Sequence, residues 1–166
     1  MQCCICLEDL GNPWGGELSM YACCGRPVHK ECGMEASKHS STCPWCRGPL
    51  PGSNEEYTCL LREGARANRG WAFFALGEHH RGETSFGSDR LAVALHERAI
   101  VHLKKDDWSR NLALGSKYVI AVVLYNQNRY RSLTEPERKR IRKLLTEASA
   151  GGLPRAKIAL ETMQDI

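Results

Sequence analysis

The sequence predicts a small cysteine-rich module followed by an all-helical domain. Eight of the nine cysteines precede Gly52, so any structure that depends on cysteine belongs to the first third of the chain. Beyond Gly52, Ala, Leu, Glu and Arg are frequent and strand-like runs are few, which favours helices. A breaker-rich stretch, Pro49 to Asn54, separates the two parts. We therefore expect a module over 1–51, a linker over 52–59 and a helical domain over 60–166.

Composition and charge narrow the possible functions. The 166 residues are 42% hydrophobic and 25% charged, a balance typical of globular proteins. The formal net charge of +4 is too small to indicate nucleic-acid binding by itself. Residues 1–51 carry four basic and five acidic residues, a net charge of −1, and the remainder carries 19 basic and 14 acidic residues, a net charge of +5. Any basic surface therefore belongs to the helical domain.

The cysteines are expected to bind metal rather than to form disulfides. A disulfide scaffold needs an oxidising compartment and a secretory signal. The first six residues have neither a basic nor an apolar signal region, and the longest apolar run, 119–124, is too short to span a membrane. We therefore expect an intracellular chain, cytoplasmic or nuclear, that has no membrane partner and uses its cysteines as metal ligands.

Eight residues of the module have the spacing of zinc ligands. Structural zinc sites take four Cys or His ligands in a closed tetrahedron, so eight ligands predict two structural zinc ions. Spacing alone leaves open whether the ligand pairs combine sequentially or interleave. In chain order the pairs are Cys3 and Cys6, Cys23 and Cys24, His29 and Cys32, and Cys43 and Cys46.

Two segments of the module, Cys3-x-Ile5-Cys6-Leu7-Glu8 and Cys43-Pro44-x-Cys46-Arg47, resemble the ends of a RING finger. The resemblance covers Cys3 to about Pro49 and implies a cross-brace, in which the two zinc sites interleave. The adjacent Cys23 and Cys24 depart from the common RING pattern, and the ligand order also occurs in PHD and RING-CH fingers. Ser41 stands where a PHD finger has Trp, so a RING is favoured. The implied first zinc site is Cys3, Cys6, His29 and Cys32, and the second is Cys23, Cys24, Cys43 and Cys46.

Two further cysteines and one histidine remain outside these sites. Cys4 is expected to be a spare thiol beside the first Cys-x2-Cys turn, with an exchange for Cys3 as the alternative. Cys59 is expected to be buried in a helix as a small hydrophobic residue. His39 is expected to be solvated in a Ser- and Lys-rich loop.

The helical domain contains an internal repeat. Leu76-Gly77-x2-His80 recurs as Leu114-Gly115-x2-Tyr118, and a partial copy aligns on Leu160. This pattern resembles Sel1-like repeats, relatives of the tetratricopeptide family, which implies helical hairpins stacked into a solenoid. A plain helical bundle remains the alternative, and Arg110 replaces the small residue of the middle copy. Left-handed turns are expected at Asn68 in the first copy and at Gly152 in the third. The equivalent positions of these two copies are Gly64 and Ala148, Asn68 and Gly152, Ala72 and Ala156, and Leu76 and Leu160.

A basic run at 138–143 is the one candidate for a nuclear signal or a nucleic-acid surface. Thr134-Glu135-Pro136-Glu137 predicts a capping box that opens a helix reaching about Ala150. In that helix, Ile141, Leu144, Leu145 and Ala148 have the spacing of a buried face. The basic residues are therefore expected to form its solvated face, and nucleic acid is not favoured as a partner.

The RING resemblance implies a ubiquitin ligase. Such a protein docks a ubiquitin-conjugating enzyme and orients its ubiquitin thioester, without a nucleophile of its own. Ile5, Pro44 and Trp45 are expected to contact that enzyme, and Arg47 to bridge it to ubiquitin, although Ala36 stands where many RINGs place a groove Trp. The helical repeats would recruit a protein substrate. The alternative is a non-enzymatic zinc-binding adaptor or scaffold.

Overall fold

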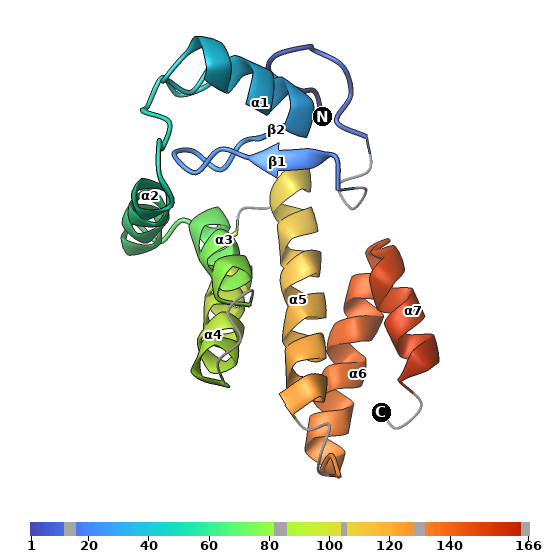
Figure 1. Cartoon of the computed structure of the whole chain (residues 1–166). Coiled ribbons are helices and arrows are strands. Elements are labelled where there is room, and N and C mark those ends of the chain that lie inside the picture. The colour runs from blue at the N-terminus through green and yellow to red at the C-terminus, as the bar shows by residue number, and fades with distance from the viewer. Residues whose placement is uncertain (12–15, 82–85, 104–105, 128–131, 164–166) are drawn as a thin grey trace.

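The computed structural model describes residues 1–11, 16–81, 86–103, 106–127 and 132–163. The parts of the expected module and helical domain that fall between these ranges, or after 163, lie outside the described residues. The described chain forms a small N-terminal module at one end of a body of helices (Figure 1). Helix α5 runs from the module through the middle of the body, with α3 and α4 on one side and α6 and α7 on the other.

The module is built from a short hairpin, one helix and two metal-binding turns. Strands β1 (Leu18–Met20) and β2 (Pro27–His29) pair antiparallel, with Ser19 opposite Val28. Helix α1 (Lys30–His39) follows β2 directly. Five residues form the module's buried core: Cys3, Leu10, Tyr21, Val28 and Cys43.

The body consists of helices that pack in chain order, each against the next, with a further contact between α3 and α5. Its largest apolar cluster joins α5, α6 and α7 around Ile141, Leu145 and Leu153. The helices are α2 (Asn54–Arg66), α3 (Gly70–Arg81), α4 (Phe86–His102), α5 (Asp107–Gln127), α6 (Glu135–Ala150) and α7 (Pro154–Thr162).

Helix α2 replaces most of the linker expected at 52–59. The helix begins at Asn54 because the Ser53 hydroxyl accepts a hydrogen bond from the Glu56 backbone N–H at 3.1 Å. Glu56 in turn accepts from the Gly52 N–H at 2.7 Å. These two bonds place a helix start inside the breaker-rich stretch. The expected burial of Cys59 is also wrong, because its side chain lies on the exposed face of α2.

The turns of the first and third copies of the internal repeat have the same backbone geometry. Asn68 (φ 53°) and Gly152 (φ 91°) are both left-handed, as the sequence predicts. The backbone N–H of Arg69 donates to the Gly64 carbonyl at 3.0 Å, and the N–H of Leu153 donates to the Ala148 carbonyl at 3.1 Å. Both bonds join equivalent residues, so the α2–α3 and α6–α7 pairs turn in the same way.

The predicted start and buried face of α6 are confirmed. The Glu137 carboxylate accepts from the Thr134 backbone N–H at 2.8 Å, and Pro136 lies in the first turn. Ile141, Leu145 and Ala148 are buried and Leu144 is partly buried, as expected for one face of an amphipathic helix.

The module and the body share apolar contacts and a close backbone approach. Ala22, next to the metal-binding Cys23 and Cys24, belongs to a buried cluster that includes Leu61, Ala75 and Leu76 of the body. The Trp108 indole N–H of α5 donates to the Gly25 carbonyl at 3.1 Å. Gly25 is left-handed (φ 71°), and a Cβ there would lie 2.2 Å from the Trp71 ring. Trp71 belongs to α3 and Trp108 to α5, so residue 25 lies against both helices. Only glycine fits at this position without displacing Trp71.

The first prediction concerns this contact. Gly25→Ala should destabilise the protein more than Gly11→Ala, because both residues are left-handed but only Gly25 would place its Cβ against a side chain. Strain alone should cost about 1–2 kcal/mol at either position. The clash with Trp71 should add about 1–3 kcal/mol. Denaturant unfolding of both variants measures the difference, and equal losses would mean that the module does not depend on Trp71 for its position.

The second prediction concerns the α6–α7 turn. Gly152→Val should lower the free energy of unfolding by about 1–2 kcal/mol, because a β-branched residue does not readily adopt a left-handed φ. A Cβ at Gly152 meets nothing within 4 Å, so the loss reports backbone strain rather than a clash. Thermal unfolding at fixed metal concentration measures it, and an unchanged midpoint would contradict the left-handed assignment.

Candidate metal centres and the surface beside them

The two Cys-x2-Cys turns of the module have nearly the same backbone. In the first, the Leu7 N–H donates to the Cys3 carbonyl at 3.0 Å, and in the second the Arg47 N–H donates to the Cys43 carbonyl at 2.9 Å. Leu7 (φ 64°) and Arg47 (φ 58°) are both left-handed. Each turn therefore directs two thiols to one side. It also holds the residue after the second cysteine in a strained, left-handed conformation.

The first candidate metal centre joins one of these turns to the start of α1. His29 ends β2 and Cys32 lies in the first turn of α1, so a spacing of three residues places both on one side of the helix. Cys6 Sγ lies 3.3 Å from His29 Nδ1. The ligand atoms of all four residues lie within 4.8 Å of one another, in the group Cys3, Cys6, His29 and Cys32.

The second candidate metal centre joins the β1–β2 loop to the other turn. Cys23 Sγ lies 3.4 Å from Cys46 Sγ, and Cys24 Sγ lies 3.8 Å from Cys43 Sγ. These four sulfur atoms also lie within 4.8 Å of one another. The two groups interleave along the chain, because residues 23 and 24 lie between the first two ligands of the other group and its last two. Each group could hold a metal ion.

Ionisation of the partly buried Cys24 thiol is unfavourable without a bound cation. Burial raises the pKa of the Cys24 thiol to about 12, and the nearby Cys43 sulfur acts in the same direction. A thiol binds metal as a thiolate. A bound cation would offset the cost of burying that negative charge, so metal binding and formation of the thiolates are coupled.

Cys4, Cys59 and His39 lie outside both groups. The His39 ring is exposed near the end of α1 and lies 3.1 Å from the Glu35 carboxylate. Its helical position differs from the expected loop, since α1 extends to His39 before the chain turns extended at Ser40. Cys4 is partly buried beside the first turn. All three are therefore additional to the eight grouped residues.

Apolar side chains are exposed on both metal-binding turns. Ile5 is 37% exposed and Leu7 is 68% exposed on the first turn, and Trp45 is 52% exposed on the second. Pro44 and Arg47 are exposed beside Trp45. The Arg26 guanidinium lies 4.4 Å from the centre of the Trp45 ring and holds that ring by a cation–π contact. Sequence analysis did not single out Leu7 for this surface, because its exposure follows from the left-handed turn.

A buried Ser–His–Glu arrangement lies in the body. His96 Nδ1 lies 3.2 Å from the Ser116 hydroxyl, and His96 Nε2 lies 3.4 Å from the Glu78 carboxylate. Burial alone would raise the pKa of Glu78, but His96 and Arg81 together hold it below its ordinary value. His96 and Ser116 are fully buried, so a substrate has no access to the hydroxyl. The three residues instead connect α3, α4 and α5.

The basic residues of α6 have acidic neighbours. Arg138 pairs with Glu135 at 3.2 Å, Arg140 pairs with Glu97 of α4, and Lys143 lies 3.9 Å from Glu147. These contacts fit a solvated helix face, and they give no specific support to a nucleic-acid surface. Within the described ranges, no helix combines the length and hydropathy that crossing a bilayer would require.

The third prediction tests which cysteines hold metal. Cys43→Ser should reduce the metal content from two ions per chain to one, because it removes a ligand from the second group. Cys4→Ser and Cys59→Ser should each keep both ions. Elemental analysis of the purified full chain measures the stoichiometry. Loss of an ion in Cys4→Ser would show that Cys4, rather than its neighbour Cys3, completes the first group.

Comparison with protein-family models, with curated proteins and with solved structures finds no match to this chain. Its function must therefore be inferred from its own residues and their geometry.

Proposed function

We propose that this protein is a RING-type ubiquitin ligase that holds two structural zinc ions. Its module docks a ubiquitin-conjugating enzyme, and its helical body, a Sel1-like scaffold, recruits a protein substrate. The observation that carries the proposal is the exposure of apolar side chains and an arginine on two metal-binding turns of the same small module.

Zinc fits the two groups by chemistry and by size. Seven thiols and one imidazole are soft or borderline ligands, which zinc accepts in four-coordinate structural sites. Zinc–sulfur bonds of about 2.3 Å in a tetrahedron separate two sulfur atoms by about 3.8 Å. In the second group the sulfur atoms lie 3.4 Å apart in the Cys23–Cys46 pair and 3.8 Å apart in the Cys24–Cys43 pair. Because each group already offers four protein ligands, bound zinc would supply folding energy rather than an open catalytic position.

The exposed apolar residues favour a protein partner on this face. Ile5, Leu7 and Trp45 keep substantial apolar area in water beside rigid metal-binding turns. Exposed apolar patches on soluble proteins commonly mark interaction sites. Arg26 already holds the Trp45 ring, so a partner would lose less conformational entropy in ordering it. Ile5, Pro44 and Trp45 would contact the conjugating enzyme, with Leu7 extending the same surface.

Arg47 is suited to orient the ubiquitin thioester. Its left-handed backbone fixes where the side chain leaves the turn. A guanidinium donates several hydrogen bonds at fixed angles, so it can contact ubiquitin and the conjugating enzyme at once. The ligase would then act by restricting the thioester to geometries in which the incoming amine can attack. The thioester bond breaks as an isopeptide bond forms, and neither step needs a nucleophile from this chain.

The fourth prediction is that Ile5→Ala and Arg47→Ala each slow ubiquitin discharge from a charged conjugating enzyme by about tenfold, equivalent to about 1.4 kcal/mol. Ile5→Ala should act by weakening enzyme binding, because it removes apolar contact area. Arg47→Ala should act mainly on the discharge rate, because the apolar surface remains. Single-turnover discharge to free lysine, alongside binding of the conjugating enzyme, separates these two effects.

Matched controls lie on α1 of the same module. Met34→Ala removes an exposed apolar side chain, and Lys38→Ala removes an exposed cation, away from the two turns. Both controls should discharge ubiquitin like the wild type, and all four variants should retain two zinc ions. If Ile5→Ala and Arg47→Ala match an active wild type, the proposed contact surface is wrong. If the wild type discharges ubiquitin from none of a panel of conjugating enzymes, the chain is instead a zinc-binding adaptor.

A further inference from the structure

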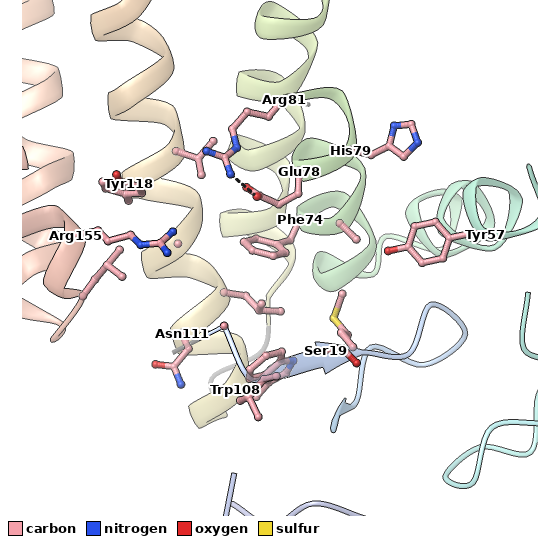
Figure 2. A pocket seen from close by; sticks show the side chains of 18 residues that line it. Ser19, Tyr57, Phe74, Glu78, His79, Arg81, Trp108, Asn111, Tyr118 and Arg155 are labelled. Carbon is pink, nitrogen blue, oxygen red and sulfur yellow. Dashed lines mark hydrogen bonds and ion pairs between the residues drawn. The ribbon is translucent and has the colours of Figure 1, made fainter. Parts of the chain in front are cut away.

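A cavity of about 790 Å³ lies where the module meets the helical body. Figure 2 shows its walls, which come from β1, from α3, from α5 and from the start of α7. This volume lies in the range of about 300–1,000 Å³ in which proteins bind small molecules and side chains of partners. The cavity is distinct from both metal centres, and none of the eight candidate ligands lines it.

One face of α5 forms a largely apolar floor. Trp108, Leu112, Gly115 and Val119 recur at spacings of four, three and four residues, so they share one side of the helix. Gly115 lies near the middle of the 21-residue helix. A glycine in a helix interior costs about 1 kcal/mol relative to alanine. Its presence here leaves the centre of the cavity floor without a side chain.

The adjacent walls are also apolar. Met20 of β1, Phe74 of α3 and Leu153 before α7 line the space around this floor. Figure 2 shows the Phe74 ring above Trp108, on the side of α5 that faces α3. A bulky aliphatic or aromatic side chain from a partner would bury its apolar area in this part of the cavity.

The polar groups give the cavity a net positive charge. On the α3 side, Arg81 pairs with Glu78 at 2.9 Å, so these two charges offset each other. On the opposite side, Arg155 extends toward α5 from the first turn of α7 (Figure 2). Arg155 has no ion-pair partner among the residues that the structure describes. With two arginines and one glutamate, and with histidine not counted, the lining carries a formal net charge of +1.

Two further features favour an anionic group near Arg155. Helix α7 starts beside it without a side-chain N-cap, so the partial positive charge of the helix N-terminus adds to that of the guanidinium. The Asn111 side chain and the Tyr118 hydroxyl lie on the same side of α5 as Arg155 and can donate hydrogen bonds to an oxygen anion (Figure 2). The cavity thus pairs an apolar centre with a cationic edge.

We propose that this cavity docks an extended segment of a partner protein in which an Asp or Glu lies close to a bulky apolar residue. The apolar side chain enters above Gly115, and the carboxylate pairs with Arg155. Arg155 is exposed, so a bound chain can continue past it into solvent, which favours a side-chain carboxylate over a terminal one. The segment is the recognition element of a ubiquitination substrate, and in this respect the inference rests on the proposed ligase function.

A displayed library of random ten-residue peptides tests the proposal without any ubiquitin transfer. The library is selected on the zinc-loaded full chain and counter-selected on Gly115→Leu, which should fill the cavity. The expected outcome is enrichment of peptides with Asp or Glu within two positions of Phe, Trp, Leu or Met. Absence of enrichment, or enrichment of basic peptides, would overturn the proposal. Neither result depends on ligase activity, so failure here is distinguishable from failure of the proposed function.

Variants on the surface of α7 keep the test independent of how well Gly115→Leu folds. A synthetic peptide of the enriched sequence should bind Arg155→Ala about tenfold more weakly than the wild type. Lys157→Ala should leave its affinity unchanged, because Lys157 carries the same charge on the same helix but does not line the cavity. Equal binding to wild type and Arg155→Ala would contradict the proposed site.

Variants of the peptide show whether the bound carboxylate belongs to an Asp or Glu side chain or to the C-terminus of the chain. Replacing its Asp or Glu by the amide should reduce affinity about tenfold, while amidating its C-terminus should have no effect. If only the free C-terminus matters, the occupant is a chain terminus, and the proposal of an internal acidic residue is wrong.

Discussion

The loop between β1 and β2 connects the chemistry of the module to the helical body. Within three consecutive residues it supplies Cys23 and Cys24 to one candidate metal centre and the left-handed Gly25 to the interface. The carbonyl of Gly25 accepts from Trp108, and its missing Cβ leaves space for Trp71. Because metal binding would order this loop, it would also order the surface against which α3 and α5 pack. Metal content and the stability of the interface should therefore be thermodynamically linked.

This arrangement sets the relative positions of the two surfaces that we propose bind partners. The β1–β2 hairpin leads into the second metal centre at its loop, while Met20 of β1 lines the cavity between module and body. The metal-binding turns that carry Ile5 and Trp45 belong to the same small core. A partner on these turns and a peptide in the cavity would thus bind to parts of the chain that are in direct contact. For a protein that acts by orientation, a fixed distance between its two partners is a physical advantage.

Sequence analysis predicted features whose physical basis is local and missed features that depend on tertiary packing. The left-handed turns at Asn68 and Gly152 and the capping box at Thr134 follow from the preferences of a few adjacent residues, and the structure has them. The interleaved metal groups were implied by a resemblance, since spacing alone left two pairings open. The start of α2 was signalled by Ser53 and Glu56, but Pro and Gly nearby made that stretch look like a linker. The exposure of Cys59 and the cavity itself depend on which helix faces are covered, which a single periodic pattern does not specify.

The two glycines of the Leu-Gly repeat illustrate how equivalent sequence positions acquire different roles. A Cβ at Gly77 would lie 2.7 Å from His96 Nε2, so the space beside this glycine is filled by a buried ring from α4. That ring also contacts Phe74 edge-on, with the centroids 5.4 Å apart, and it connects to Ser116 and Glu78. Gly115 occupies the matching position of the next copy, yet it lines the open cavity. The repeat therefore places a residue without a side chain at the same position in both copies. In the first copy it allows close packing of α3 and α4, and in the second it leaves an apolar site beside Arg155.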